Sequence, residues 1–156
     1  MNNITINELN INELEPYVYN VCKVLGLDQE SSLVDIEFVH SFGDGAAGYC
    51  SGDDELIDVE IAYNDQVGEL PSDLLKKHIA HELIHAQQIA TGRLENVGIC
   101  LRNMNGLKDT VVNVVIWEGK EYINCAYDEQ PWEIEAYAQE ESVMNQAIKY
   151  TQSKIQ

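Results

Sequence analysis

The segment His81-Glu82-Leu83-Ile84-His85 lies in the middle of a stretch that is expected to form one long helix. Apolar residues recur there at the spacing of a helix with one buried side, namely Leu75, Ile79, Leu83, Ala86 and Ala90. Pro71 and Ser72 open this helix, with Ser72 as its N-cap, and Thr91 and Gly92 close it. Two histidines four residues apart then project from one side, one turn apart. The fold must therefore cover one face of this helix and keep the histidine face accessible.

The two histidines and the glutamate after the first of them form an HExxH pattern, which has a chemical meaning when it lies on a helix. The imidazoles of His81 and His85 can both reach one Zn²⁺ at roughly 2.0–2.1 Å. Glu82 lies on the same side of the helix as the two histidines but one residue out of register with them. Its carboxylate can therefore approach a metal-bound water without binding the metal. The pattern predicts a zinc hydrolase of amide bonds with Glu82 as general base. A solvated helix face that carries these side chains is the simpler interpretation.

A catalytic zinc site usually has three protein ligands and leaves its fourth position to water, so a third ligand is needed. The helix expected from Pro131 to about Tyr150 offers the carboxylates Glu133 and Glu135. Glu133 shares a side with Trp132, Ala136, Tyr137, Val143, Met144 and Ala147, whereas Glu135 neighbours Gln139, Ser142 and Gln146. We predict Glu133 as the third ligand, with Glu135 as the alternative.

The two other histidines are weaker candidates for the metal. His78 lies one turn before His81, too close along the helix to complete a tetrahedron, and is expected to be exposed or to support a ligand. His40 falls on the apolar side of a strand pattern, which favours a buried histidine over a metal ligand.

The remaining segments alternate between helical and strand patterns. A first amphipathic helix is expected over residues 13–25. Residues 33–42 and 57–63 alternate between apolar and polar side chains, which predicts two half-buried strands that share a sheet, and glycines break the chain between them. Residues 110–117 and 120–126 predict a β-hairpin with a tight turn at Glu118 and Gly119.

These segments predict an α+β fold in a single domain that spans residues 1–156. A chain of this length buries roughly two thirds of its unfolded surface and can build a core without disulfides. We expect a small, mostly antiparallel sheet packed on the HExxH helix, with the ligand-bearing helix at the C-terminus.

The helical HExxH and the later Glu133-Ile134-Glu135-Ala136 segment, an ExxA pattern, resemble those of the gluzincins. The short chain, its hairpin and its Pro-Trp-Glu-Ile-Glu-Ala-Tyr run look like the minimal zincins of phages and mobile elements, over roughly residues 32–150. The resemblance implies a zincin-like fold, metallopeptidase activity and zinc bound by His81, His85 and Glu133. Many gluzincins follow ExxA with Asp or Asn, which supports a motif histidine, whereas this chain has Tyr137 there. Either other residues support that histidine in this chain, or the third ligand lies two residues further along the helix, at Glu135.

The resemblance also implies features around the metal. Strand 56–63, just before the HExxH helix, would be the sheet edge on which an extended substrate lies. Zincins of several kinds add a tyrosine or histidine that stabilises the oxyanion, and Tyr122, Tyr127 and Tyr137 are candidates here. Each of these tyrosines can instead be a packing aromatic.

The chain is strongly acidic, with 27 Asp and Glu against 9 Lys and Arg and a formal net charge of −18. This charge repels phosphate groups, so neither nucleic acid nor an anionic membrane is an expected partner. Residues 1–15 lack the segments of a secretory signal, and the longest apolar run, 111–117, is far below the ~20 residues of a membrane helix. Four cysteines without a CxxC pair favour reduced thiols. We therefore expect a cytoplasmic location.

The predicted function is that of a zinc metallopeptidase that acts on a protein or peptide substrate, with one specific protein as its target. The alternative is a protein-interaction module in which zinc stabilises the fold without catalysis. A domain without metal, such as a virion component, is a third interpretation, which metal analysis separates from the other two.

Overall fold

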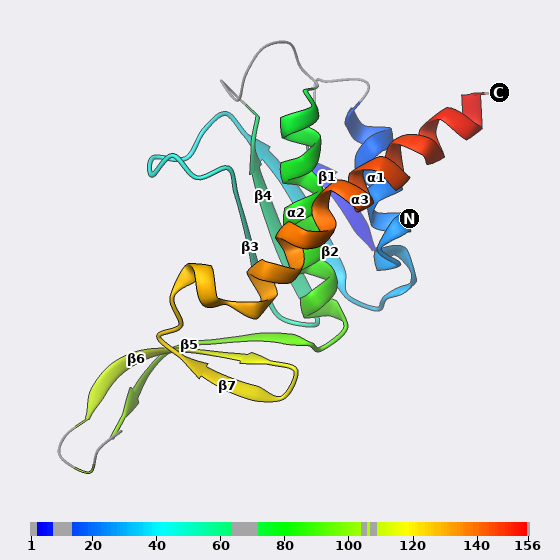
Figure 1. Cartoon of the computed structure of the whole chain (residues 1–156). Coiled ribbons are helices and arrows are strands. Elements are labelled where there is room, and N and C mark those ends of the chain that lie inside the picture. Colours follow the sequence, from blue (N-terminus) through cyan, green and yellow to red (C-terminus); the bar gives the residue numbers. More distant parts are fainter. Residues whose placement is uncertain (1–2, 8–13, 64–71, 104–105, 107–108, 156) are drawn as a thin grey trace.

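The computed structural model describes residues 3–7, 14–63, 72–103, 106 and 109–155, which form an α+β fold (Figure 1). The elements are β1 (Ile4–Asn7), α1 (Leu14–Val24), a 3₁₀ helix (Leu27–Gln29), β2 (Leu33–Val39), β3 (Gly48–Gly52), β4 (Leu56–Ala62), α2 (Asp73–Ala90), β5 (Leu94–Arg102), β6 (Thr110–Trp117), β7 (Lys120–Ile123), a second 3₁₀ helix (Tyr127–Glu129) and α3 (Pro131–Ile155). The α+β class is thereby confirmed, whereas the zincin-like fold stays a prediction. The expectation of one domain over residues 1–156 stays a prediction.

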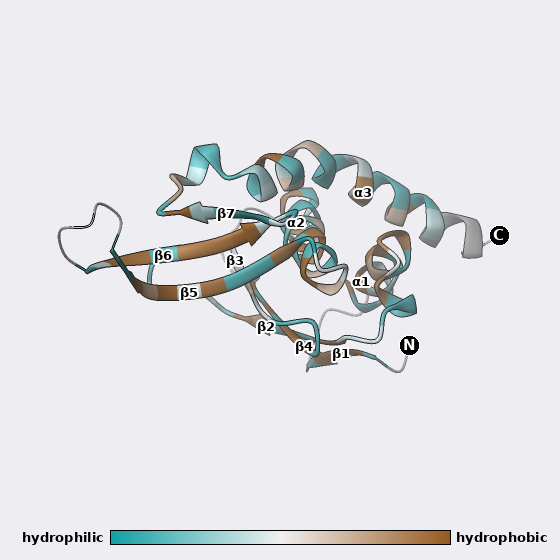
Figure 2. Cartoon of the chain, turned by 90° about the horizontal axis from the view of Figure 1, so that it is seen from below, coloured by the Kyte–Doolittle hydropathy of each residue, from teal (hydrophilic) through white to brown (hydrophobic). Residues whose placement is uncertain are grey.

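A four-stranded sheet with the order β1-β2-β4-β3 lies on one side of the helices (Figure 2). β1, β2 and β4 are parallel, and β3 is antiparallel to β4 at the edge. Alternation along β2 and β4 buries one face of each strand, with Val34, Ile36, Phe38, Ile57, Val59 and Ile61 in the core. The predicted pairing of these two strands in one sheet is confirmed.

Helix α2 packs on β3 and β4 with one side and on α3 with another. Leu83 and Ile84, inside the HExxH segment, are fully buried, and burial of each such side chain stabilises the fold by about 1.5–3 kcal/mol. The predicted N-cap is confirmed, because the Ser72 hydroxyl accepts a hydrogen bond from the Leu75 amide at 3.1 Å. Pro71 lies outside the described residues.

A second, antiparallel sheet consists of β5, β6 and β7 in that order. Its predicted hairpin is confirmed, and Glu118 and Gly119 in the turn both have positive φ, 49° and 82°, as a two-residue type I′ turn requires. Leu94, Val115 and Trp117 join this sheet to the main core. The outer part of β5 and β6 extends away from the helices (Figure 1).

The strand assignments differ from the prediction in several places. β1, β3 and β5 lie outside the predicted strands. In two of them the apolar alternation is broken, by the glycines of β3 and by the bulge between Asn96 and Gly98 in β5. Of the five strand pairs among the described residues, three are antiparallel and two are parallel. The sheet that packs on α2 is therefore mixed, with β3 as its antiparallel strand.

The prediction that strand 56–63 is a sheet edge is wrong. β4 is hydrogen-bonded on both sides, to β2 and to β3. The edge next to α2 is β3, whose sequence Gly-Tyr-Cys-Ser-Gly carries a weak strand signal. The other edge strand of this sheet among the described elements is β1.

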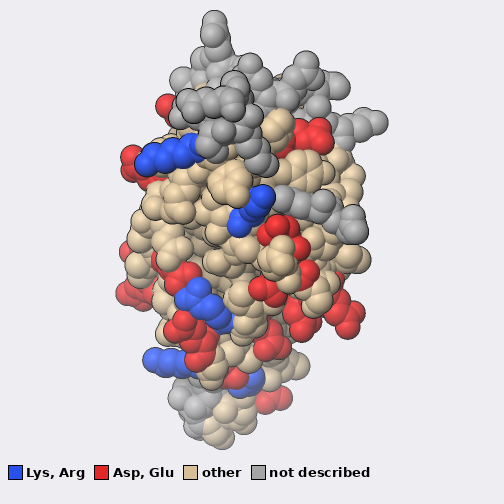
Figure 3. Space-filling view, turned by 90° about the vertical axis from the view of Figure 1, so that its right-hand side faces the viewer, with Lys and Arg blue, Asp and Glu red and all other residues tan. Residues whose placement is uncertain are grey.

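The cysteines agree with the expectation of reduced thiols. On the face drawn in Figure 3, acidic groups are spread over the surface with basic groups between them. Cys22, Cys50, Cys100 and Cys125 are all free thiols. Within the described part of the chain, every helix is too short or too polar to cross a membrane.

Candidate metal centre

Three predicted side chains meet at one point between α2 and α3. The Nε2 atoms of His81 and His85 lie 2.9 Å and 3.1 Å from the same oxygen, Oε1 of Glu133. All three side chains offer a donor atom within 4.8 Å of the others, and both rings are buried. The structure thus brings together the three residues predicted as ligands.

Local folding explains why these side chains meet. The i, i+4 spacing puts both rings on the side of α2 that faces α3, while Leu83 and Ile84 face the sheet and the core. On α3, Trp132 and Ala136 are buried beside Glu133, and the small Ala136 permits a close approach of the two helices. The apolar stripe of α3 therefore carries Glu133 to the histidines.

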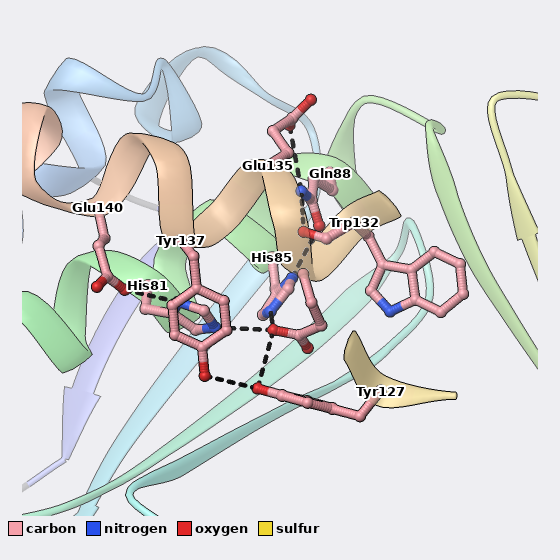
Figure 4. Close-up of polar contacts among 9 residues, drawn as sticks. His81, His85, Gln88, Tyr127, Trp132, Glu135, Tyr137 and Glu140 are labelled. Atoms are coloured by element: carbon pink, nitrogen blue, oxygen red, sulfur yellow. Dashed lines mark hydrogen bonds and ion pairs between the residues drawn. The ribbon is translucent and has the colours of Figure 1, made fainter. Parts of the chain in front are cut away.

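The second nitrogen of each histidine also has a partner (Figure 4). Nδ1 of His81 lies 2.8 Å from Oε2 of Glu140, and Nδ1 of His85 lies 2.8 Å from Oε1 of Gln88. The Gln88 amide nitrogen donates to the Trp132 carbonyl at 3.1 Å and to Glu135 at 3.2 Å, which turns its oxygen towards His85. Both rings are held by their Nδ1 atoms with Nε2 directed at Glu133.

The donor set fits a divalent metal ion. Each ring faces an oxygen acceptor at both of its nitrogens. All four contacts are hydrogen bonds only if each ring carries a proton on both nitrogens and is positively charged. A cation held by His81, His85 and Glu133 would replace those protons, and the Nδ1 contacts would then favour the tautomer that leaves Nε2 free to bind it. Tetrahedral donors at about 2.0 Å from zinc lie roughly 3.3 Å apart. The two nitrogen–oxygen distances, 2.9 and 3.1 Å, are close to that value, and all three donor atoms lie within 4.8 Å of one another.

Without a metal, the three groups perturb one another electrostatically. Burial lowers the pKa of His81 and of His85, but hydrogen bonds, chiefly to Glu133, and the negative charges of Glu133 and Glu82 together outweigh it, so both pKa values are raised. Burial raises the pKa of Glu133, yet its hydrogen bonds to the two histidines outweigh that effect and bring the pKa down to about 2. The site strongly favours a carboxylate next to positive charge.

Glu82 lines the same cavity but is outside the donor triad. Its side chain passes over Gly48 on β3, where a Cβ atom would lie only 2.8 Å from the Glu82 Cγ. Burial raises the pKa of Glu82, and the charges of His85 and His81 oppose that shift only in part. A carboxylate with a raised pKa beside the candidate metal ligands has the properties of a general base.

Two of the three candidate tyrosines lie at the site. The Tyr127 hydroxyl donates to Oε1 of Glu133 at 3.3 Å and lies 2.8 Å from the Tyr137 hydroxyl. The Tyr137 ring lies against the His81 ring, with centroids 4.5 Å apart. Tyr122 instead packs edge-on against Trp132 at 5.6 Å and is outside the cavity lining. Tyr127 and Tyr137 thus remain candidates for contact with a bound carbonyl.

Glu135 points away from the donor triad. It accepts hydrogen bonds from Gln88 and from the guanidinium of Arg93, the latter at 2.8 and 2.5 Å. The hydrogen bonds from Arg93 lower its pKa more than burial raises it. Glu135 therefore reaches only the Nδ1 side of His85, through Gln88, and contacts none of the three atoms of the donor triad.

The other two histidines are also outside the donor triad. His78 is half-buried and lines the cavity one turn from His81. His40 follows the last residue of β2, is exposed and contacts Tyr63 edge-on at 5.8 Å. The prediction that His40 is buried is wrong, because β2 ends at Val39, before the alternation would place His40 in the core.

Gln88, Glu140 and Arg93 are parts of the site that the sequence analysis missed. Gln88 lies three residues after His85 on α2, and Glu140 lies seven residues, two turns, after Glu133 on α3. A search for polar residues at these helical spacings from each ligand would have found both. Arg93 follows the end of α2 and carries no such signal.

A comparison of this chain with protein-family models, curated proteins and solved structures found no match.

Proposed function

We propose that this protein is a zinc-dependent peptidase that cleaves a peptide bond of a protein substrate. One observation carries the proposal, namely that Nε2 of His81, Nε2 of His85 and Oε1 of Glu133 converge while Glu82 lines the same cavity outside the triad. Two imidazoles and a carboxylate are a donor set of hydrolytic zinc sites, which keep one position for water. A structural zinc site would use a fourth protein ligand instead.

The residues around the triad have distinct roles in this proposal. A zinc ion held there supplies Lewis acidity towards the substrate carbonyl and makes a water more acidic. Glu82 takes the proton of the attacking water and passes it to the leaving amine. The hydroxyl group of Tyr127 or of Tyr137 would turn from its present hydrogen-bond acceptor to donate to the carbonyl oxygen as negative charge develops on it.

The shape of the cavity favours an extended peptide as the substrate. The cavity has a volume of about 1200 Å³, and β3 residues line one wall while residues of the β5-β6-β7 sheet line the other. β3 is an edge strand among the described elements, so its backbone groups can pair with a peptide strand. A peptide on β3 would pass beside Glu82, because Gly48 contacts that side chain.

The test is a comparison of the native chain with Glu82→Gln. We expect each to bind about one equivalent of zinc, because three ligands remain in both. Only the native chain should hydrolyse an unfolded protein, since the amide of the variant cannot take a proton. Elemental analysis and a cleavage assay measure the two properties.

Three outcomes would contradict the proposal. Absence of zinc after zinc-supplemented expression would favour a domain without metal. Zinc binding without hydrolysis by the native chain would favour an interaction module. Loss of zinc from Glu82→Gln would make Glu82 a ligand or a support for the ligands.

A further inference from the structure

The outer part of the β5-β6 hairpin carries large apolar side chains at its surface. Ile99, Leu101 and Val111 are 74%, 68% and 61% exposed. Figure 2 shows this part of both strands as mainly hydrophobic and extended beyond the helices. Single exposed apolar residues are common, but neighbouring ones form a patch that indicates a binding surface.

Strand register shows that these three side chains are neighbours. Leu101 is paired with Val111, and Ile99 is paired with Asn113. Directly paired residues of antiparallel strands project from the same face, and residues two apart along a strand also share a face. Ile99, Leu101 and Val111 therefore form one continuous surface, which we name the apolar strip.

The apolar strip continues a wall of the metal-site cavity. Leu94, Asn96, Asn113 and Val115 line that cavity, and register puts all four on the same sheet face as the strip. Val115 and Val111 are four residues apart on β6, roughly 13 Å at about 3.3 Å per residue. A chain that leaves the cavity along this face meets the strip within about four residues.

The opposite face of the hairpin is already covered. Val112 and Val114 project to that side and are buried at 3% and 0% exposure. The ion pair between Arg102 and Glu121, at 2.8 Å, joins β5 to β7 on the same side. Exposed apolar side chains thus gather on the face that leads to the cavity.

Charge decides which occupant fits. The formal charge of −18 makes a second copy of this chain, or an acidic segment, an unfavourable neighbour. Across the whole chain, 27 acidic residues against 9 basic ones attract a basic segment at long range. An occupant that is apolar over the strip and carries basic residues beside that part matches both the strip and the charge of the whole chain.

We propose that the apolar strip docks an extended substrate segment whose apolar residues lie about four or more positions from the cleaved bond, with basic residues between. This inference rests on the proposed peptidase function for its biological meaning. The strip then selects the substrate by side chains remote from the chemistry, which gives the enzyme a narrow specificity.

The test measures the binding of three labelled synthetic peptides of equal length to the zinc-loaded Glu82→Gln chain by fluorescence anisotropy. The first peptide has an apolar half of Val and Leu and a half that contains Lys. In the second, Ser and Gly replace the apolar half, and in the third, Glu replaces Lys. We expect the first peptide to bind at least about tenfold more tightly than the other two.

A matched pair of double variants locates the binding surface. Ile99→Thr with Leu101→Thr should weaken binding of the first peptide about tenfold. Leu33→Thr with Leu56→Thr is the control, because these leucines are also paired across strands and are 55% and 46% exposed, on the other sheet. Threonine keeps a strand-compatible, uncharged side chain, and circular dichroism checks that both variants fold.

The outcomes separate this inference from the proposed function. If the two double variants bind the first peptide with equal affinity, the apolar strip does not dock the substrate. A native dimer in sedimentation analysis that is lost only in the Ile99→Thr, Leu101→Thr variant would also overturn it, because the strip would then be a self-interface. Peptide binding that depends on the strip, with no hydrolysis by the native chain, would leave the strip standing and contradict the peptidase proposal alone.

Discussion

At the residue scale, two glutamates that lie two positions apart on one helix have different partners. Glu133 contacts both histidines, whereas Glu135 contacts Gln88 and Arg93. A rotation of about 100° per residue turns the two side chains roughly 200° apart. The register of α3, which begins at Pro131, thus selects the donor.

We expect Glu133→Ala to lower zinc affinity by more than about 100-fold, because it removes a donor atom. Glu135→Ala should change the affinity by less than about tenfold, since Glu135 acts only through Gln88. A competition titration with a chromophoric chelator measures both. Loss of zinc from Glu135→Ala with retention in Glu133→Ala would reverse the assignment and the placement of α3.

Glu140 tests whether the Nδ1 contacts orient the histidines. Glu140→Gln should weaken zinc binding about tenfold or more, because the neutral amide is a poorer acceptor for the His81 ring. Glu141→Gln is the matched control, since it removes the same charge from the next position, which is exposed. Equal affinities in the two variants would mean that Glu140 contributes only its long-range charge.

At the element scale, the edge strand β3 and helix α2 approach each other so closely that one position excludes a side chain. A Cβ on Gly48 would lie 2.8 Å from Glu82 Cγ and 3.0 Å from the Glu60 carbonyl oxygen. The glycine is therefore required by the contact between two elements, not by its own backbone angles. It lets the proposed general base lie directly beside the strand that would bind a peptide.

Gly48→Ala should displace the Glu82 carboxylate and lower kcat/KM about tenfold or more, with zinc affinity unchanged. Gly43→Ala is the control, because nothing lies within 4 Å of a Cβ at that position. Kinetics on an unfolded protein and a zinc titration measure the two effects. Equal activity of both variants would show that Glu82 tolerates the added methyl group, and a loss of zinc would point to a wider shift of α2.

At the scale of the whole molecule, the candidate metal site joins parts of the fold that are far apart in sequence. α2 contributes two donors and α3 the third, and Arg93 connects α3 to the turn after β6 through Glu135 and Glu118. A ligand that binds only the folded state stabilises that state by mass action. Metal binding should therefore stabilise the packing of α3 on the rest of the chain.

Removal of zinc by a chelator should lower the melting temperature by on the order of 10 °C. This follows from about 4 kcal/mol of linkage when free zinc is roughly 1,000 times its Kd, and from about 2–4 °C per kcal/mol for a chain of this size. Glu133→Ala, which should not hold zinc, should show little change on chelation. The same melting curve for the native chain before and after verified metal removal would argue against a site in the folded state.

Local periodicity was sufficient for much of the fold and for the donor residues. The HExxH helix, the hairpin at Glu118 and Gly119, and the preference for Glu133 over Glu135 all follow from which side chains share a face within one element. Such a pattern is present in the sequence before any tertiary contact forms. That is why His81 and His85 could be assigned to one face of their helix, and Glu133 to the inward face of a helix about 50 residues later.

Only the tertiary structure decided which faces meet. The partners of His81 lie 52 and 59 residues away, and no local pattern encodes the packing of α2 on α3 that brings them together. β3 became the edge strand through pairing with β4, although its own sequence is rich in glycine and poor in strand signal. Strand pairing likewise directed Ile99, Leu101 and Val111 outward on the cavity side, because backbone hydrogen bonds between strands, not side-chain periodicity alone, set the register.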